Sequence, residues 1–227
     1  LALVRRRFGW LYLLIPLMGL TRPGVLAFAL LLGVYGLWRW RHRATDPLPA
    51  RQIVHIVSLG ALAVAVGFSW QVIAGIATDD PSAYLHTELS WRRGWTGDDG
   101  GFVPFEGFVQ ASVIWFRVWG LPEPLGYVAL AVLVAAIAAL LLFEPHVRRL
   151  GVEIRLWSAS YVLYLLLVFF PQSSIFRLLL PLAPLYGALA LPRHPAWRWS
   201  VLGVGLVLQW WWIYQMLVLG TTFTQIP

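Results

Sequence analysis

The chain contains no cysteine and no lysine. Without cysteine it cannot form disulfide bonds, thiolate metal sites or a thiol nucleophile. All 17 basic residues are therefore arginines, a bias typical of proteins from GC-rich genomes. The five histidines are scattered and no two of them have ligand spacing, so we expect neither a metal site nor a cofactor.

Charge is also scarce. Charged residues make up 12% of the 227 residues, whereas 59% are hydrophobic and the mean hydropathy is +0.72. A soluble domain of this composition would leave much apolar surface in water, whereas a bilayer accepts it. The composition therefore predicts an all-α, polytopic membrane protein. The net charge of +7 does not indicate nucleic-acid binding, because the arginines flank hydrophobic segments.

Seven apolar segments predict a transmembrane helical bundle of about seven spans. They are Phe8–Leu20, Val25–Trp38, Ile53–Ala77, Leu125–Phe143, Leu156–Phe170, Ile175–Leu191 and Trp199–Leu219. An aromatic-rich piece near residues 108–120 predicts an interfacial helix. The first two segments give only about 20 Å of helix against a hydrocarbon core of about 30 Å. Either flanking residues complete these crossings, or the turn between them lies within the outer half of the membrane.

The positions of the arginines predict the orientation. Arginine clusters precede the first segment and fill the connections after the second, fourth and sixth. Placing these regions in the cytoplasm satisfies the positive-inside rule. The loop region 78–107 is then extracytoplasmic, and it holds six acidic residues against two arginines. We expect a single integral membrane domain over residues 1–227, multi-pass in the plasma membrane. Because the sequence begins with leucine, we expect it to be the C-terminal portion of a longer protein.

This topology places three polar islands on the same, outer side: Thr21–Gly24, residues 78–107 and Pro171–Arg177. Two of them carry an arginine at the edge of the apolar zone, Arg22 and Arg177, where charge is costly and usually functional. A guanidinium can hold a phosphate through two parallel hydrogen bonds. The alternative is an arginine that reaches toward the outer headgroups. Gln172 and Ser173 add polar groups just before Arg177.

The loop region offers further candidate binding residues. Tyr84, His86, Glu88 and Trp91 combine an acid, an imidazole and aromatic rings. A sheltered carboxylate suits a base or a contact to sugar hydroxyls, and an indole face suits stacking on a sugar. The alternatives are a solvated loop charge and an ordinary surface histidine. The sequence by itself identifies no catalytic residue.

Three motifs resemble bacterial relatives of the second GPI mannosyltransferase, the PIG-V family. They are Thr21-Arg22 at an outer turn; Ala83-Tyr84-Leu85-x-Thr87-Glu88 followed by Trp91-Arg92-x-x-Trp95; and Gln172-Ser173-Ser174-x-x-Arg177-Leu178-Leu179-Leu180-Pro181-Leu182-x-Pro184. The family consists of polytopic GT-C-type glycosyltransferases, and the arginine-only composition suits an actinobacterial member. The resemblance covers residues 8–191 and corresponds to the C-terminal part of the family.

This resemblance implies a transferase that moves a sugar, most often mannose, from a polyprenyl-phosphate donor to a lipid or glycan acceptor outside the cytoplasm. It maps the family's two arginines onto Arg22 and Arg177. GT-C enzymes usually carry a catalytic aspartate in their first outer loop, whereas this chain has no acid before Asp46. We therefore expect the catalytic acid upstream of this chain. The less favoured alternative is an acid of residues 78–107.

Two other classes of function fit the same residues. A transporter or flippase for a lipid or another anionic substrate also uses membrane-embedded arginines and broken helices. A non-catalytic membrane subunit is the other alternative. Membrane lipids are partners in every case, and we expect no nucleic acid.

Overall fold

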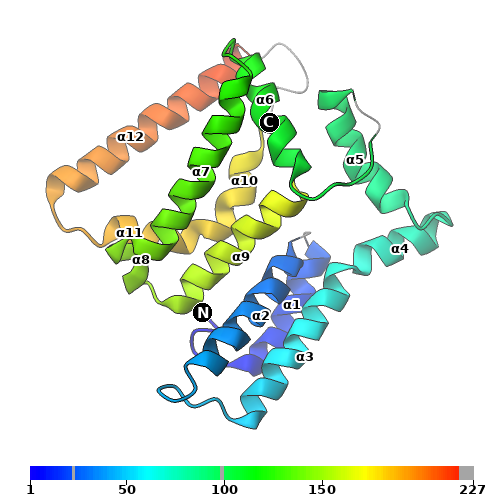
Figure 1. Ribbon diagram of the computed structural model, residues 1–227, viewed down its shortest axis with the longest axis vertical. Helices are drawn as coiled ribbons and strands as arrows, with labels where there is room; N and C mark the ends of the chain where they lie inside the picture. The colour runs from blue at the N-terminus through cyan, green and yellow to red at the C-terminus, as the bar shows by residue number, and fades with distance from the viewer. Residues whose placement is uncertain (22–23, 98–99, 220–227) are drawn as a thin grey trace. The chain divides into compact units, whose positions relative to one another are not determined.

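The computed structural model describes residues 1–21, 24–97 and 100–219, and these contain helices and loops but no strand (Figure 1). In chain order the helices are α1 (Phe8–Thr21), α2 (Val25–Arg41), α3 (Ala50–Gly67), α4 (Ser69–Thr78), α5 (Ala83–Thr96), α6 (Glu106–Val118), α7 (Pro124–Phe143), α8 (Pro145–Arg149), α9 (Val152–Val168), α10 (Ile175–Leu179), the 3-10 helix η1 (Leu180–Leu185), α11 (Tyr186–Ala190), α12 (Pro195–Ile213) and the π-helix η2 (Tyr214–Val218). The all-α prediction is confirmed for the described residues.

Three helical stretches are long and apolar enough to cross a membrane. They are Ala50–Thr78, which joins α3 and α4, Pro124–Phe143 (α7) and Pro195–Val218, which joins α12 and η2. In the most apolar window of each stretch, no more than 17% of the residues are buried inside the protein. Apolar helices whose side chains face outward need a nonaqueous surrounding, so these stretches indicate a membrane protein.

The helices divide into two compact units. Unit 1 comprises residues 1–90 and 152–165, and unit 2 comprises residues 91–151 and 166–227. In unit 1, α3 packs against both α1 and α2 (Figure 1). Ile15, Leu32, Tyr35, Leu59 and Ala63 are almost completely buried at the centre of this unit. A polar contact joins α1 to α3, where the Tyr12 hydroxyl lies 3.1 Å from His55 Nδ1.

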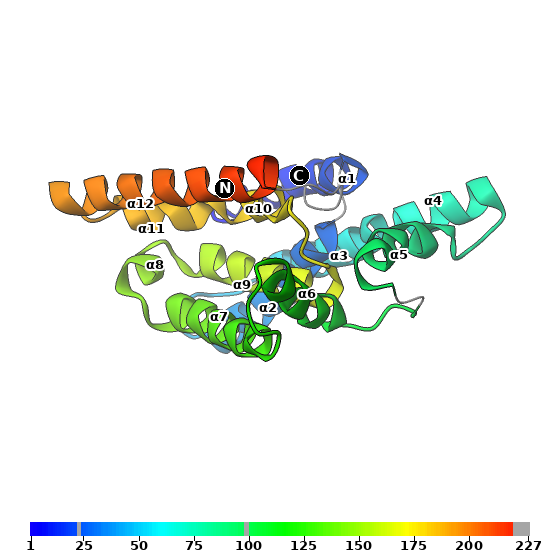
Figure 2. The same cartoon turned by 90° about the horizontal axis from the view of Figure 1, so that it is seen from above.

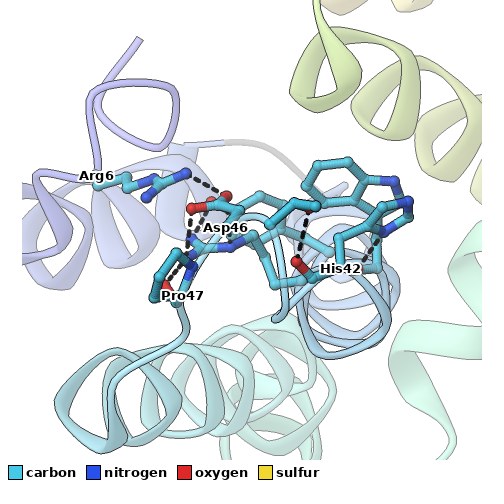
Figure 3. A network of polar contacts seen from close by, with 8 residues as sticks. Arg6, His42, Asp46 and Pro47 are labelled. Atoms are coloured by element: carbon cyan, nitrogen blue, oxygen red, sulfur yellow. Dashed lines mark hydrogen bonds and ion pairs between the residues drawn. The ribbon is translucent and has the colours of Figure 1, made fainter.

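An ion-pair network closes the end of unit 1 where α2 leads to α3. Arg39 is completely buried, and its Nε lies 3.0 Å from Asp46 Oδ2. The same guanidinium donates hydrogen bonds to the Pro47 carbonyl at 2.9 Å and to the Tyr35 hydroxyl at 3.2 Å. Arg6 points at the Asp46 carboxylate from the chain segment before α1 (Figure 3). One carboxylate therefore ties the start of the chain to the α2–α3 connection.

In unit 2, α6 lies against α7 (Figure 2). The two helices can approach closely because Gly126 of α7 has no side chain. A Cβ at this position would lie 2.5 Å from the Ser112 carbonyl oxygen. Trp115 of α6 is buried in an aromatic cluster. The ring centroids of Trp95, Trp119 and Trp212 each lie within 6.1 Å of the Trp115 ring centroid.

The seven segments expected to span are helical over most of their length, with one clear departure from a simple span. Residues 175–191 do not form one helix but α10, η1 and α11 in succession. Pro181 and Pro184 explain this, because proline lacks the amide hydrogen that an α-helix needs. The expected outer loop region contains α5, and the piece near residues 108–120 is helical as α6. Whether seven segments cross the membrane stays a prediction.

Candidate functional site

The first polar island is held in place by unit 1. Arg22 lies outside the described residues, but both sides of its turn are defined. The Trp70 indole donates a hydrogen bond to the Gly19 carbonyl at 3.0 Å, which fixes the end of α1. Gly24 has φ +133°, a conformation that side chains other than glycine rarely adopt, and α2 begins at the next residue.

Two tyrosines of α9 lie beside this turn. A Cβ placed on Gly24 would be 3.9 Å from the Tyr164 ring and 4.0 Å from the Tyr161 ring. Tyr161 is buried and its ring packs against that of Tyr164. Neither tyrosine was predicted as a site residue from the sequence. The signal available was a pair of tyrosines three residues apart within an apolar segment.

The first turns of α5 bring two predicted site residues into the same neighbourhood. Tyr84 lies near the Glu88 carboxylate one helical turn later. Burial, followed by the nearby Glu88 charge, raises the pKa of Tyr84 to about 12, so the phenol remains a hydrogen-bond donor at neutral pH. Tyr164 of α9 lies near both residues. In unit 1, Tyr84, Glu88 and Gly24, the last residue of the first polar island, therefore all lie near Tyr164.

His86 and Trp91, the other predicted site residues of α5, lie at more exposed positions. His86 Nδ1 lies 3.8 Å from Asp80 Oδ2, and both side chains are largely exposed. Asp80 accepts hydrogen bonds from the Ser82 hydroxyl and amide just before α5, which lower the pKa of its carboxyl group. This contact pattern is that of a turn leading into a helix. Trp91 is 56% exposed on α5.

The arginine and second tryptophan of the Trp91–Trp95 motif have structural contacts in unit 2. Arg92 forms an ion pair with Glu106 and donates from Nε to Gln110 Oε1 at 2.8 Å. Gln110 in turn donates to Glu106 at 3.1 Å. Trp95 packs in the aromatic cluster. These contacts fix α5 to α6, and they engage one of the six acids of the outer loop region.

The third island is anchored on both sides of its polar residues. The Trp115 indole donates to the Pro171 carbonyl at 2.9 Å, and the Phe176 ring meets the Trp212 ring edge-on at 4.8 Å. Between these anchors, the Ile175 amide donates to the Gln172 carbonyl at 3.0 Å and Ser173 is buried. The aromatic cluster of unit 2 therefore holds residues 171–176 in a defined conformation.

Arg177 follows directly on this anchored segment. Its side chain is exposed, and no acidic residue in the described part of the chain forms an ion pair with it. Arg6, Arg39, Arg92 and Arg117, in contrast, each pair with a carboxylate. An exposed guanidinium without a described carboxylate partner, at the start of a helix broken by prolines, is suited to an exogenous anion.

The predicted site residues thus form two groups. Tyr84 and Glu88 lie together in unit 1, and Gln172, Ser173 and Arg177 follow one another in unit 2. Among the described residues, no three of the histidine, aspartate and glutamate side chains gather closely enough to hold a metal ion.

Comparisons of the chain with family models, with curated proteins and with solved structures found no match.

Proposed function

We propose that this chain is part of a polytopic membrane glycosyltransferase of the GT-C type. It acts on a polyprenyl-phosphate-linked sugar, most often mannose, at the outer face of the plasma membrane. The acceptor is a lipid or a glycan. The proposal includes seven spans, with the three polar islands on the extracytoplasmic side. The resemblance to the PIG-V family supports this proposal.

The proposal rests mainly on the environment of the Arg177 side chain. Its backbone is anchored through the neighbouring Phe176, while its charge has no described acidic partner. When a glycosidic bond to a lipid phosphate breaks, negative charge develops on the leaving phosphate. A guanidinium fixed beside that phosphate stabilises the charge. We assign this role to Arg177 and, by the resemblance, to Arg22.

Tyr84 and Glu88 supply a second kind of contact. A carboxylate accepts hydrogen bonds from sugar hydroxyls, and the nearby Tyr84 phenol offers a further hydrogen-bond donor. In this proposal Glu88 binds the sugar, and the catalytic acid lies upstream of this chain. The less favoured alternative assigns catalysis to an acid of residues 78–107.

The first test is binding of the lipid phosphate, because binding does not require the catalytic acid. A photoreactive polyprenyl phosphate is added to the purified protein in lipid nanodiscs, and covalent labelling is measured as a function of its concentration. Arg177→Lys should weaken labelling about tenfold or more, since lysine keeps the charge but loses the bidentate geometry. Arg193→Lys is the matched control, because Arg193 is exposed and belongs to a predicted cytoplasmic connection.

Unchanged labelling of the Arg177→Lys variant would show that Arg177 does not bind the lipid phosphate. Equal weakening in both variants would show that any arginine contributes through general charge, and it would contradict a defined site.

The interrupted helix formed by α10, η1 and α11 also fits a second function, which is transport of the lipid-linked substrate. Discontinuous helices at a substrate site are also typical of secondary transporters, and α10, η1 and α11 form such a helix. Membranes containing the full-length protein, which includes the proposed upstream catalytic acid, and a polyprenyl-phosphate mannose donor with an acceptor distinguish the two functions. A transferase yields a mannosylated product, whereas a flippase moves the intact donor between leaflets. If the donor crosses the membrane unchanged and no product forms, the transferase proposal is wrong.

A further inference from the structure

A pocket of about 360 Å³ lies in unit 1 between α2 and α3, which pack side by side (Figure 1). Its volume falls within the range for small-molecule sites, about 300–1,000 Å³. Every residue that lines it is glycine or a hydrophobic residue. Leu37 and Val57 of the lining are 67% and 65% exposed, so the pocket opens to the surroundings of the protein. Because α3 belongs to a stretch that is long and apolar enough to cross a membrane, those surroundings are lipid.

Glycines create the space in this α2–α3 pocket. Gly33 of α2 and Gly60 of α3 both line it, and a Cβ added at either position would meet no atom within 4 Å. Gly126 shows the opposite pattern, because its added Cβ would lie 2.5 Å from a backbone oxygen of α6. The glycines of the pocket therefore leave a hollow on the helix pair instead of bringing two helices together.

The pocket extends over about half the thickness of a membrane. Its lining on α2 runs from Ala29 to Trp40, and its lining on α3 runs from Ile53 to Val64. On each helix this separation of 11 positions corresponds to about 16 Å at about 1.5 Å per residue. A hydrocarbon core is about 30 Å thick, so the pocket spans one leaflet. A lipid acyl chain occupies one leaflet, whereas a transmembrane helix of a partner crosses both.

Three exposed arginines lie at one end of the pocket. The Arg43 guanidinium carbon lies 4.7 Å from the centre of the Trp40 ring, which lines the pocket. Arg41 directly follows Trp40 at the end of α2, and Arg51 lies in the first turn of α3, two residues before Ile53. The pocket therefore joins an apolar body to a cationic end.

The acid nearest to these arginines in the sequence is already engaged. Asp46 is the only acidic residue before Asp79, and both Arg6 and Arg39 form ion pairs with it. None of the ion pairs in the described part of the chain brings a carboxylate to Arg41, Arg43 or Arg51. Their charges are therefore left for an anion from outside the described residues.

We infer that the α2–α3 pocket binds one acyl chain of an anionic phospholipid, whose phosphate lies against Arg41, Arg43 and Arg51. A guanidinium forms charge-assisted hydrogen bonds with a phosphate. Basic residues beside a helix end attract anionic lipids of the cytoplasmic leaflet, and the α2–α3 connection lies on the predicted cytoplasmic side. This site is separate from the proposed donor site, because Gly24 and the first polar island lie at the opposite end of α2.

A second copy of this chain fits the pocket less well than a phospholipid. Copies in one membrane have the same orientation, so docking at this face would bring both arginine clusters to the same level. Like charges that meet at an interface oppose association. An anionic phospholipid brings the opposite charge to the same place.

Photo-crosslinking of lipids tests the inference. The purified protein is placed in phosphatidylcholine nanodiscs with a small fraction of a lipid that carries a diazirine in one acyl chain and either a phosphatidylglycerol or a phosphatidylcholine headgroup. After illumination, mass spectrometry measures labelling of the α2 and α3 peptides. We expect the phosphatidylglycerol probe to label these peptides about fivefold or more above the phosphatidylcholine probe.

Variants separate the headgroup contact from the chain contact. Arg41→Gln should lower labelling by the phosphatidylglycerol probe about fivefold and leave the phosphatidylcholine probe unchanged. Arg198→Gln is the matched control, since Arg198 is exposed on α12 and does not line the pocket. Gly33→Leu should fill the pocket and lower labelling by both probes, whereas Gly9→Leu, an equally open position on α1, should not. All four variants should keep the wild-type thermal midpoint, because none of the substituted positions is closely packed.

Several outcomes would overturn the inference. Equal labelling by the two headgroups, or an equal loss in Arg41→Gln and Arg198→Gln, would show that the arginines do not select the lipid. Unchanged labelling in Gly33→Leu would show that the chain does not occupy the pocket. Single-molecule photobleaching that finds paired copies, separated by Gly33→Leu, would make the pocket a protein interface. Displacement of the phosphatidylglycerol probe by polyprenyl phosphate more readily than by unlabelled phosphatidylglycerol would make it part of the donor site. None of these readouts involves Arg177, so failure here leaves its proposed role unaffected.

Discussion

At the scale of single residues, the arginines of this chain have different environments. Arg39 is fully buried and surrounded by Asp46, the Pro47 carbonyl and Tyr35. Arg177 is exposed and has no described acidic partner. From the sequence, Arg39 was one of the arginines predicted to lie in the cytoplasm and to set the orientation, and no structural role was predicted for it. Charge counting cannot separate the two environments, because burial depends on how α1, α2 and α3 pack.

Asp46→Asn should destabilise unit 1 by about 2 kcal/mol, since a buried guanidinium loses its carboxylate. The effect also depends on pH. The hydrogen bond from Arg6, followed by the charge of Arg39, lowers the pKa of Asp46 in the folded state. Its contribution is therefore present above the unfolded pKa of about 3.9 and is lost as the pH falls through the lower folded value.

Thermal unfolding of the detergent-solubilised protein between neutral and acidic pH measures this effect. Wild type should lose stability in acid more steeply than Asp46→Asn, and the two should converge at low pH. Asp79→Asn is the control, because Asp79 is exposed in a left-handed conformation that asparagine tolerates. If the control loses as much stability as Asp46→Asn, the ion-pair network does not hold unit 1 together.

At the scale of helices, close packing depends on a few small residues. Gly126→Ala would bring a methyl group within 2.5 Å of the Ser112 carbonyl oxygen, and a backbone atom cannot move aside as a flexible side chain can. We expect the variant to lose about 1–3 kcal/mol of stability in unit 2. Gly203→Ala on α12 is the matched control, since nothing lies within 4 Å of its added Cβ.

The control should be neutral or slightly stabilising, because alanine is the better helix former. Unfolding midpoints of the two variants, measured under the same conditions, give the comparison. Equal midpoints would contradict the packing of α6 against α7.

The sequence predicted much of the helical structure and less of the site. Long apolar stretches identify α7 and α12 directly, and the two prolines explain why residues 175–191 form three short helices. The Tyr161–Tyr164 pair beside Gly24 was not predicted, because that contact joins segments far apart in the chain. For the same reason, Arg92 was included in a binding motif, whereas the structure pairs it with Glu106.

At the scale of the whole molecule, the proposed function depends on which side of the membrane each polar island faces. A phosphate-binding Arg177 and a sugar-binding Glu88 serve one reaction only if their islands face the same aqueous compartment. Positive-inside counting predicts that they do. Three stretches long and apolar enough to cross a membrane indicate a membrane protein, whereas the side of each loop stays a prediction.

The most direct test of this central claim is sided labelling of single cysteines, and the native chain has no cysteine to interfere. Thr21→Cys, Asp98→Cys and Ser174→Cys each represent one polar island, and Thr45→Cys represents the predicted cytoplasmic side. Intact cells are treated with a membrane-impermeant thiol reagent before and after lysis. The account predicts that the three island cysteines react in intact cells and that Thr45→Cys reacts only after lysis. An island cysteine that reacts only after lysis would contradict the predicted outer location of the three islands, and the proposed transferase would then be wrong.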